Sequence, residues 1–265
     1  MGSWLLGPLD TDGLHTLAAA GADKVVLDFA GLESDGAARD DWREAAREWL
    51  RAQRQQVLAH KRFERWVRIG GVGSGVWRED LAAAMTGAPD GILLGMIDTP
   101  GELQEMAALV YEHEQRSGLP LNSVRLAVAL GGSPRAALTV EQFADALHPR
   151  VDAVTWNTDA LARKLGVKRS RKADGSWIDP LARVRASAIL VAHAQGLQAV
   201  EAACPARMEA RVVGMAAKLA SNDGCHAMLA STPAHVATIA QGFGVPTAKA
   251  GSHEETDGRT LLNVA

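Results

Sequence analysis

The sequence has few cysteines and no long apolar run, and each shortage excludes a class of protein. Its only two cysteines, Cys204 and Cys225, are too few for a disulfide framework or for a structural zinc site. No apolar stretch reaches the ~18 residues that cross a bilayer. The first ten residues lack a basic segment and are interrupted by Gly7-Pro8, so they are not expected to be a signal peptide. We expect a cytoplasmic protein with no membrane partner.

No excess of basic charge is present either. The chain of 265 residues carries 28 Lys and Arg against 31 Asp and Glu, which argues against a nucleic-acid partner. Hydrophobic residues make up 47% of the chain, enough for a sizeable core. No linker rich in Pro, Gly or Ser divides the sequence. We expect a single domain over residues 1–246 and a polar C-terminal tail over residues 247–265.

Short β-rich runs alternate with helical patterns along the whole chain. Several runs are almost continuously apolar, which is typical of strands buried on both faces of a parallel sheet. Eight strand–helix units in this length predict an α/β fold, a (β/α)8 TIM barrel, with an open doubly wound sheet as the alternative. The predicted strands are residues 4–6, 24–29, 65–69, 91–94, 124–130, 153–156, 198–202 and 225–230.

The predicted helices between these runs have recognisable start signals. Thr99-Pro100-Gly101-Glu102 is a capping box with proline at the first helical position, and residues 139–142 repeat the box. Asp179-Pro180 and Thr232-Pro233 are further helix starts. An apolar stripe in a later helix is expected to pack in the core; it consists of Met208, Val212, Met215 and Leu219.

Charged residues interrupt three of the apolar runs. Asp28 and Arg68 lie near the ends of the second and third runs, and Glu201 lies inside the seventh. Active sites of (β/α)8 barrels are built at the C-terminal ends of the strands, and a charge in an apolar run needs a partner or a solvated cleft. We therefore predict that Asp28, Arg68 and Glu201 are catalytic, with Arg68 also gripping a substrate carboxylate or carbonyl. Structural salt bridges are the alternative.

Three loops carry possible ligand contacts. The glycine-rich segment 70–75 could cradle a phosphate through backbone N–H groups, although its spacing fits neither a dinucleotide fingerprint nor a P-loop. The glycine pair at 131–132 permits close approach of backbone to a ligand. The basic run Lys168–Lys172 could bind phosphates of a nucleotide-like cofactor, and a solvated loop is its alternative.

Seven segments follow a family pattern in the right order. The first predicted strand is followed by a turn with proline at 7–10. Residues 25–31, 67–70 and 129–136 resemble the family motifs VILDLED, VRVN and ALIETPRG. Residues 157–166, 171–175 and 231–235 resemble the family motifs GAEDLxxxLG, RxADG and IHPxQ. Together these segments resemble the citrate lyase β-subunit-like branch of the HpcH/HpaI aldolase superfamily. The resemblance extends from Trp4 to about Val245.

The resemblance implies a (β/α)8 barrel that is often trimeric or hexameric. The family makes or cleaves a C–C bond beside a CoA thioester, usually with Mg²⁺, on substrates such as citryl-, malyl- and citramalyl-CoA. A CoA ester or an oxo acid is therefore the expected small-molecule ligand, and a homo-oligomer is the expected assembly. The predicted substrate-binding residues are Arg68, Gly132, Ser133, Arg135, Asp159, Arg171 and Asp174.

The sequence departs from the family at the residues that carry its chemistry. Gly132 and Ala160 stand where the family has its metal-binding glutamate and aspartate. Because Mg²⁺ is held by carboxylates and water, we predict no metal ligands here and weak or no dependence on Mg²⁺. Asp159, one residue before Ala160, is the nearest candidate for a remaining metal contact. Further family positions are also changed; they are Thr11, Ala30, Gly31 and Met96.

Two hypotheses follow. In the first, the chain is a divergent C–C lyase-family protein that acts on or binds a CoA thioester or oxo acid without the Mg²⁺ site. In the second, it is a non-catalytic paralogue, a binding, regulatory or partner subunit in an oligomer. Turnover by the isolated chain distinguishes the two. A plain NAD(P)-binding protein lacks the required glycine spacing.

Overall fold

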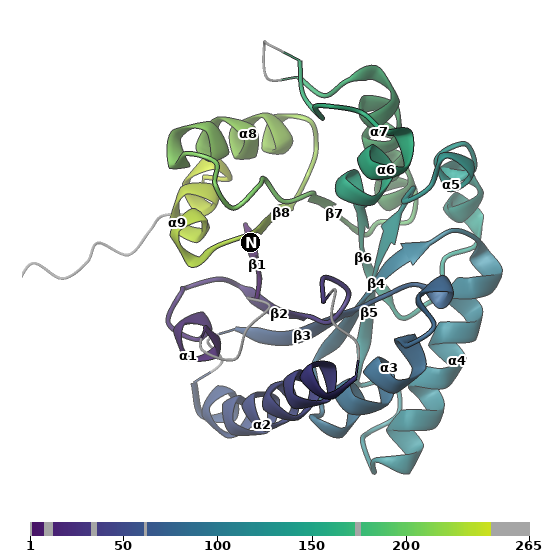
Figure 1. Cartoon of the computed structure of the whole chain (residues 1–265), viewed down its shortest axis with the longest axis vertical. Coiled ribbons are helices and arrows are strands. Elements are labelled where there is room, and N and C mark those ends of the chain that lie inside the picture. Colours follow the sequence, from purple (N-terminus) through teal and green to yellow (C-terminus); the bar gives the residue numbers. More distant parts are fainter. Residues whose placement is uncertain (1, 8–12, 33–35, 61–62, 173–175, 245–265) are drawn as a thin grey trace, which may run out of the picture.

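The chain folds into a closed barrel of eight parallel strands, with neighbours in sequence order from β1 to β8 (Figure 1). The computed structural model describes residues 2–7, 13–32, 36–60, 63–172 and 176–244, apart from the side chains of residues 15 and 55–60. The single-domain boundary and the tail predicted at 247–265 lie outside this part. The predicted TIM barrel is confirmed.

All eight predicted strands are present, with ends within three residues of those expected. The strands are β1 (Ser3–Leu6), β2 (Lys24–Asp28), β3 (Glu64–Ile69), β4 (Gly91–Ile97), β5 (Arg125–Leu130), β6 (Val151–Trp156), β7 (Gln198–Glu201) and β8 (Ala227–Ala230).

Helices lie outside the ring of strands (Figure 1). The α-helices are α1 (Leu14–Leu17), α2 (Ala37–His60), α3 (Trp77–Thr86), α4 (Pro100–Arg116), α5 (Pro134–Ala137), α6 (Thr158–Leu165), α7 (Asp179–Ala194), α8 (Ala210–Asn222) and α9 (Pro233–Gly242). Two short 3₁₀ helices, η1 (Val72–Ser74) and η2 (Val140–Asp145), lie in loops. No helix in the described ranges is long and apolar enough to cross a membrane.

Alternation along the strands separates two apolar layers. Inward residues such as Trp4, Trp66 and Leu93 form one buried cluster inside the barrel. The residues between them, such as Leu5 and Val67, belong to the larger cluster beneath the helices. Successive side chains of a strand point to opposite faces, so a residue's position in its strand decides whether it can reach a site inside the barrel.

Two of the helix predictions need correction. Residues 139–142 begin the 3₁₀ helix η2, whose Thr139 makes no side-chain cap, rather than an α-helix. The prediction that the apolar stripe of α8 packs in the core is wrong, because Val212, Met215 and Leu219 are exposed. The buried face of α8 consists of Val213, Ala217 and Ala220 instead. The stripe has helical spacing, but spacing alone does not say which face of a helix meets the sheet.

A charged cluster lies at the N-terminal end of the barrel, where the strands begin. Glu64 accepts from Lys24 at 2.9 Å, from Arg125 at 2.6 Å and from the Trp66 indole at 2.8 Å. The Lys24 ammonium also lies 4.5 Å from the Trp4 ring centre and 4.4 Å from that of Trp66. Burial alone would raise the pKa of Glu64, but these hydrogen bonds outweigh it and lower the pKa to about 2.

We therefore expect Glu64 to make the barrel sensitive to acid. Its pKa is lower in the folded state than the ordinary 4.5, so its stabilising contribution is present above about pH 4.5 and is lost as pH falls toward 2. Urea unfolding of Glu64→Gln across this range should show a shallower acid loss than the wild type. The matched control, Glu112→Gln in an exposed pair with Arg116, should follow the wild-type curve, and equal slopes for all three proteins would contradict the prediction.

Candidate ligand-binding site

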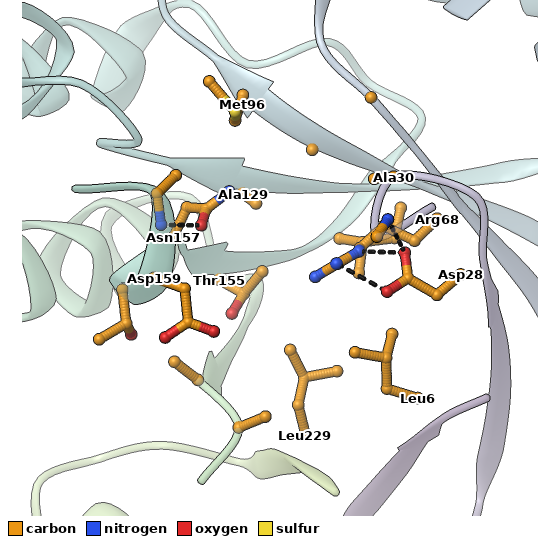
Figure 2. Close-up of a pocket in the computed structure, with 18 of the residues that line it drawn as sticks. Leu6, Asp28, Ala30, Arg68, Met96, Ala129, Thr155, Asn157, Asp159 and Leu229 are labelled. Atoms are coloured by element: carbon orange, nitrogen blue, oxygen red, sulfur yellow. Dashed lines mark hydrogen bonds and ion pairs between the residues drawn. The ribbon is translucent and has the colours of Figure 1, made fainter. Parts of the chain in front are cut away.

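A cavity of about 810 Å³ opens at the C-terminal ends of the strands. The strand ends and the loops after them supply its wall, as expected for a barrel of this type. Part of the wall is apolar: Leu6, Ala129 and Leu229 lie around the cavity (Figure 2), and Leu93 also lines it. The charged side chains of the wall are Asp28, Arg68, Asp98, Glu102, Asp159, Arg163 and Lys164.

Asp28 and Arg68 form a two-pronged ion pair in this wall (Figure 2). The two residues are in register on β2 and β3, and Arg68 donates from Nε and Nη2 to the two Asp28 oxygens, each at 2.7 Å. The Asp28 side chain is 5% exposed, whereas that of Arg68 is 25% exposed. Since Nη1 is not used in this pair, the guanidinium can donate to a ligand while Asp28 fixes its orientation.

Side-chain hydrogen bonds to its backbone hold the loop after β2 in place. Asp28 Oδ1 accepts the Gly31 N–H at 3.0 Å. Arg39 donates to the carbonyls of Phe29 and Leu32 at 3.0 and 3.3 Å. The buried Asp80 carboxylate in turn holds Arg39. This edge of the cavity is therefore preorganised by hydrogen bonds to its backbone.

The end of β4 is irregular at Met96, one of the positions where the sequence departs from the family pattern. The β4–β5 register shifts between Leu94 and Ile97, and Met96 has a φ of +57°, a left-handed value uncommon for a side chain of this kind. A Cβ atom placed on Gly71 would lie only 2.4 Å from the Met96 carbonyl oxygen. Gly71 is thus required by the close approach of the two loops.

Asp98 follows β4 and faces the cavity. Its Oδ2 accepts from the Ser133 hydroxyl at 3.0 Å, and its N–H donates to Glu102 at 2.9 Å. One of the two hydrogen bonds of the predicted capping box is present: Thr99 accepts the Glu102 N–H at 3.3 Å. The Glu102 side chain accepts the N–H of Asp98 rather than that of Thr99. Ser133 is accordingly buried behind Asp98 and does not line the cavity.

The end of β6 supplies a polar wall. Asn157 caps α6 by accepting the Ala160 N–H at 3.1 Å, which places Asp159 on the cavity side (Figure 2). Thr155 and Thr158 also line the cavity. Both threonines are more than nine-tenths buried, and their hydroxyls have no hydrogen-bond partner within the described part of the chain.

Glu201 lies outside the cavity, which corrects its predicted catalytic role. Its position in β7 turns the side chain toward the helices, where it is 2% exposed. Trp156 Nε1 donates to it at 2.9 Å, and it forms an ion pair with Arg185 of α7. Arg185 is therefore the partner that a glutamate in an apolar strand requires. The alternative of a structural salt bridge fits Glu201.

We expect Glu201→Gln to lower the free energy of unfolding by about 1.5–3 kcal/mol, because the largely buried Arg185 loses a charged hydrogen-bond partner and keeps only the exposed Asp223. Equilibrium unfolding in urea measures this loss. Glu112→Gln, at an exposed pair on α4, should cost about 0.5 kcal/mol or less. A folded Glu201→Gln protein with wild-type stability would contradict this structural role.

Only some of the predicted site residues lie at the cavity. Asp28, Arg68 and Asp159 line the cavity, whereas Arg135 is exposed on α5. Arg171 stacks over Trp177, with its guanidinium 3.6 Å from the ring centre, and burial lowers its pKa. None of the five residues 168–172 lines the cavity. Asp174 lies outside the described residues.

Sequence reasoning missed several residues of the wall. Asp98 directly follows β4 in the structure, but the strand was predicted to end at residue 94, so the rule that selected Asp28 did not reach it. Thr155 is a polar residue within an apolar run, which is a weaker signal. Arg163 and Lys164 are exposed cations at the mouth of the cavity on α6, and nothing in their spacing separates them from ordinary surface charges.

Comparison with known proteins identifies the family. Residues 4–233 match the HpcH/HpaI aldolase/citrate lyase family. The chain belongs to this family. A curated relative from Mycobacterium tuberculosis, named citrate lyase subunit beta-like protein, is 30% identical over 199 residues. That alignment covers 75% of this chain but 63% of the relative, so this HpcH/HpaI-family chain spans less than two-thirds of the relative's length.

Solved structures share the fold of this HpcH/HpaI-family chain. The CitE protein of M. tuberculosis in complex with magnesium, acetoacetate and coenzyme A is 24% identical, with a TM-score of 0.70 and coverage of 96% of this chain and 82% of that one. RipC from Yersinia pestis is 23% identical, with a TM-score of 0.67 and coverage of 93% and 95%. At these identities the likeness shows the fold alone.

Solved relatives hold magnesium, and two positions of the family pattern bring no carboxylate to this cavity. Gly132 and Ala160 bring no carboxylate, and a Cβ at Gly132 would lie 3.1 Å from Met96 Cγ. Asp28 is already bound to Arg68. No group of three or more His, Cys, Asp or Glu among the described residues is placed to hold a metal ion.

Proposed function

We propose that the cavity binds a small oxo acid or its CoA thioester, and that it does so without the family's divalent metal. The observation that carries this proposal is the Asp28–Arg68 pair, which holds a charged fork in the wall of a large cavity. Arg68 would bind the ligand's carboxylate or polarise its carbonyl. Asp28 acts as a positioning residue, because both of its oxygens accept hydrogen bonds from Arg68.

The size of the cavity favours a ligand larger than a free oxo acid. A small acid would fill only a fraction of 810 Å³, and the arm of a thioester could occupy the remainder. Arg163 and Lys164 at the mouth offer the positive charge that coenzyme A phosphates would need. Relatives support this ligand class: solved structures of M. tuberculosis proteins contain acetoacetate with coenzyme A, and oxaloacetate.

A non-catalytic role is the second candidate. It is favoured by the loss of carboxylates at both Gly132 and Ala160 together with the outward position of Glu201. Such a chain would bind the ligand as a regulatory or partner subunit of an oligomer. The two candidates share the same ligand and differ only in whether the isolated chain turns it over.

The test combines binding with turnover. Titration of the purified chain with acetoacetate should show binding of equal strength in Mg²⁺ and in EDTA. Cleavage of citryl-, malyl- and citramalyl-CoA is then assayed under the same two conditions. Product in both conditions supports metal-free chemistry, and binding without product supports the non-catalytic role. Product that depends on Mg²⁺ would overturn the metal-free proposal, and absence of binding would overturn the ligand class.

A further inference from the structure

Of the two unpaired hydroxyls in the cavity wall, those of Thr155 and Thr158, the one on Thr155 lies on a barrel strand. Thr155 lies near the end of β6, at an inward position, and is 3% exposed. Its Oγ1 is buried and has no hydrogen-bond partner among the described residues. An unsatisfied buried hydroxyl costs about 1–3 kcal/mol. Because buried polar groups in proteins are nearly always paired, this hydroxyl indicates a partner outside the described residues, and a ligand in the cavity is in the right place to supply it.

The surroundings of Thr155 leave room for such a partner. It is in register with Ala129 of β5, and the next inward residues are Ala127 and Ala153. Large inward side chains such as Trp4 and Trp66 fill the opposite part of the barrel. The cavity therefore has small side chains on the β5–β6 side, and Figure 2 shows Thr155 projecting into it.

Thr155 and Arg68 line the same cavity and offer different kinds of contact. Arg68 offers charged donors that suit a carboxylate, whereas a hydroxyl both donates and accepts and suits a neutral oxygen. We propose that Thr155 is a ligand-contacting, specificity-determining residue, which hydrogen-bonds a carbonyl or hydroxyl oxygen of an acid whose carboxylate is held by Arg68. This inference rests on the proposed function and deepens it, because it selects oxo and hydroxy acids over plain carboxylic acids.

Two probe acids that differ in one oxygen test the inference. Acetoacetate has a keto group that butyrate lacks, and both carry the same carboxylate. Dissociation constants are measured by ligand-observed NMR titration for wild type, Thr155→Val and Thr155→Ser. We expect wild type to prefer acetoacetate by about 10-fold, the effect of one hydrogen bond. Thr155→Val should bind both acids like butyrate, and Thr155→Ser should keep the preference. Thr155→Ala gives the same comparison if the valine variant does not fold.

Each outcome separates this inference from the proposed function. If wild type binds both acids equally, or if the variants without the hydroxyl keep the preference, the role of Thr155 is overturned while binding to Arg68 stands. If wild type binds neither acid, the proposed ligand class fails and the inference fails with it. Loss of butyrate binding in Thr155→Val would show that the residue acts on the shape of the cavity, which also contradicts the proposal.

Discussion

Replacing Arg68 by glutamine is expected to weaken binding of acetoacetate by about 10- to 100-fold, because hydrogen bonds to a charged group contribute about 1.5–3 kcal/mol. The guanidinium lines the cavity, and two hydrogen bonds from one of its edges to the Asp28 oxygens, at 2.7 Å each, fix its orientation. Lysine should not rescue binding fully, since a point charge cannot reproduce the fork. Calorimetric titration of wild type, Arg68→Gln and Arg68→Lys measures the effect.

A second variant separates binding from folding. Arg68→Gln leaves the Asp28 carboxylate, 5% exposed, without its counter-charge, and this alone would cost about 3–5 kcal/mol of stability. The double variant Asp28→Asn with Arg68→Gln removes both charges and should recover most of that stability. It should still lack the affinity for acetoacetate. Wild-type affinity in the double variant would show that Arg68 holds β2 and β3 together and does not contact the ligand.

The barrel could be predicted from the sequence because its strands carry a local signal. A run such as Leu126–Leu130 is apolar throughout, and strands buried on both faces need that composition. The helix starts at Thr99 and Thr232 are local signals as well. The orientation of α8 was not predictable in this way, because the choice between the Val212 face and the Val213 face depends on what the sheet presents to the helix.

The candidate site was predictable only where strand ends identify it. Asp28 and Arg68 lie at inward positions and line the cavity, where the rule for barrel enzymes expects site residues. Glu201 satisfies the same rule in sequence but falls on the outward face of β7, and its partner Arg185 is a helix residue. A shift of one residue along a strand moves a side chain to the other face. Strand ends are uncertain by more than one residue from sequence alone, and this uncertainty decides between a catalytic residue and a structural ion pair.

Restoring two carboxylates should create the dependence on magnesium that the wild type is expected to lack. Gly132→Glu and Ala160→Asp return the acids of the family pattern, and Met96→Ala removes the Cγ that lies 3.1 Å from a Cβ at residue 132. Ala160 is buried in the first turn of α6 and lines the cavity, where the helix N-terminus favours a carboxylate. A ligand acid that shares the cavity with a bound cation gains affinity by linkage, by about 5- to 150-fold.

Acetoacetate titrations with Mg²⁺ and with EDTA compare the triple variant with wild type and with Met96→Ala alone. We expect a Mg²⁺-dependent gain in affinity for the triple variant only, because the single variant adds space but no ligand oxygen. Linkage also requires acetoacetate to strengthen Mg²⁺ binding by the same factor, which a titration with the metal measures independently. A wild type that already responds to Mg²⁺ would show that Asp98 or Asp159 binds the cation, and the metal-free proposal would then be wrong. A triple variant that folds but does not respond would show that more than the carboxylates separates this cavity from those of its relatives.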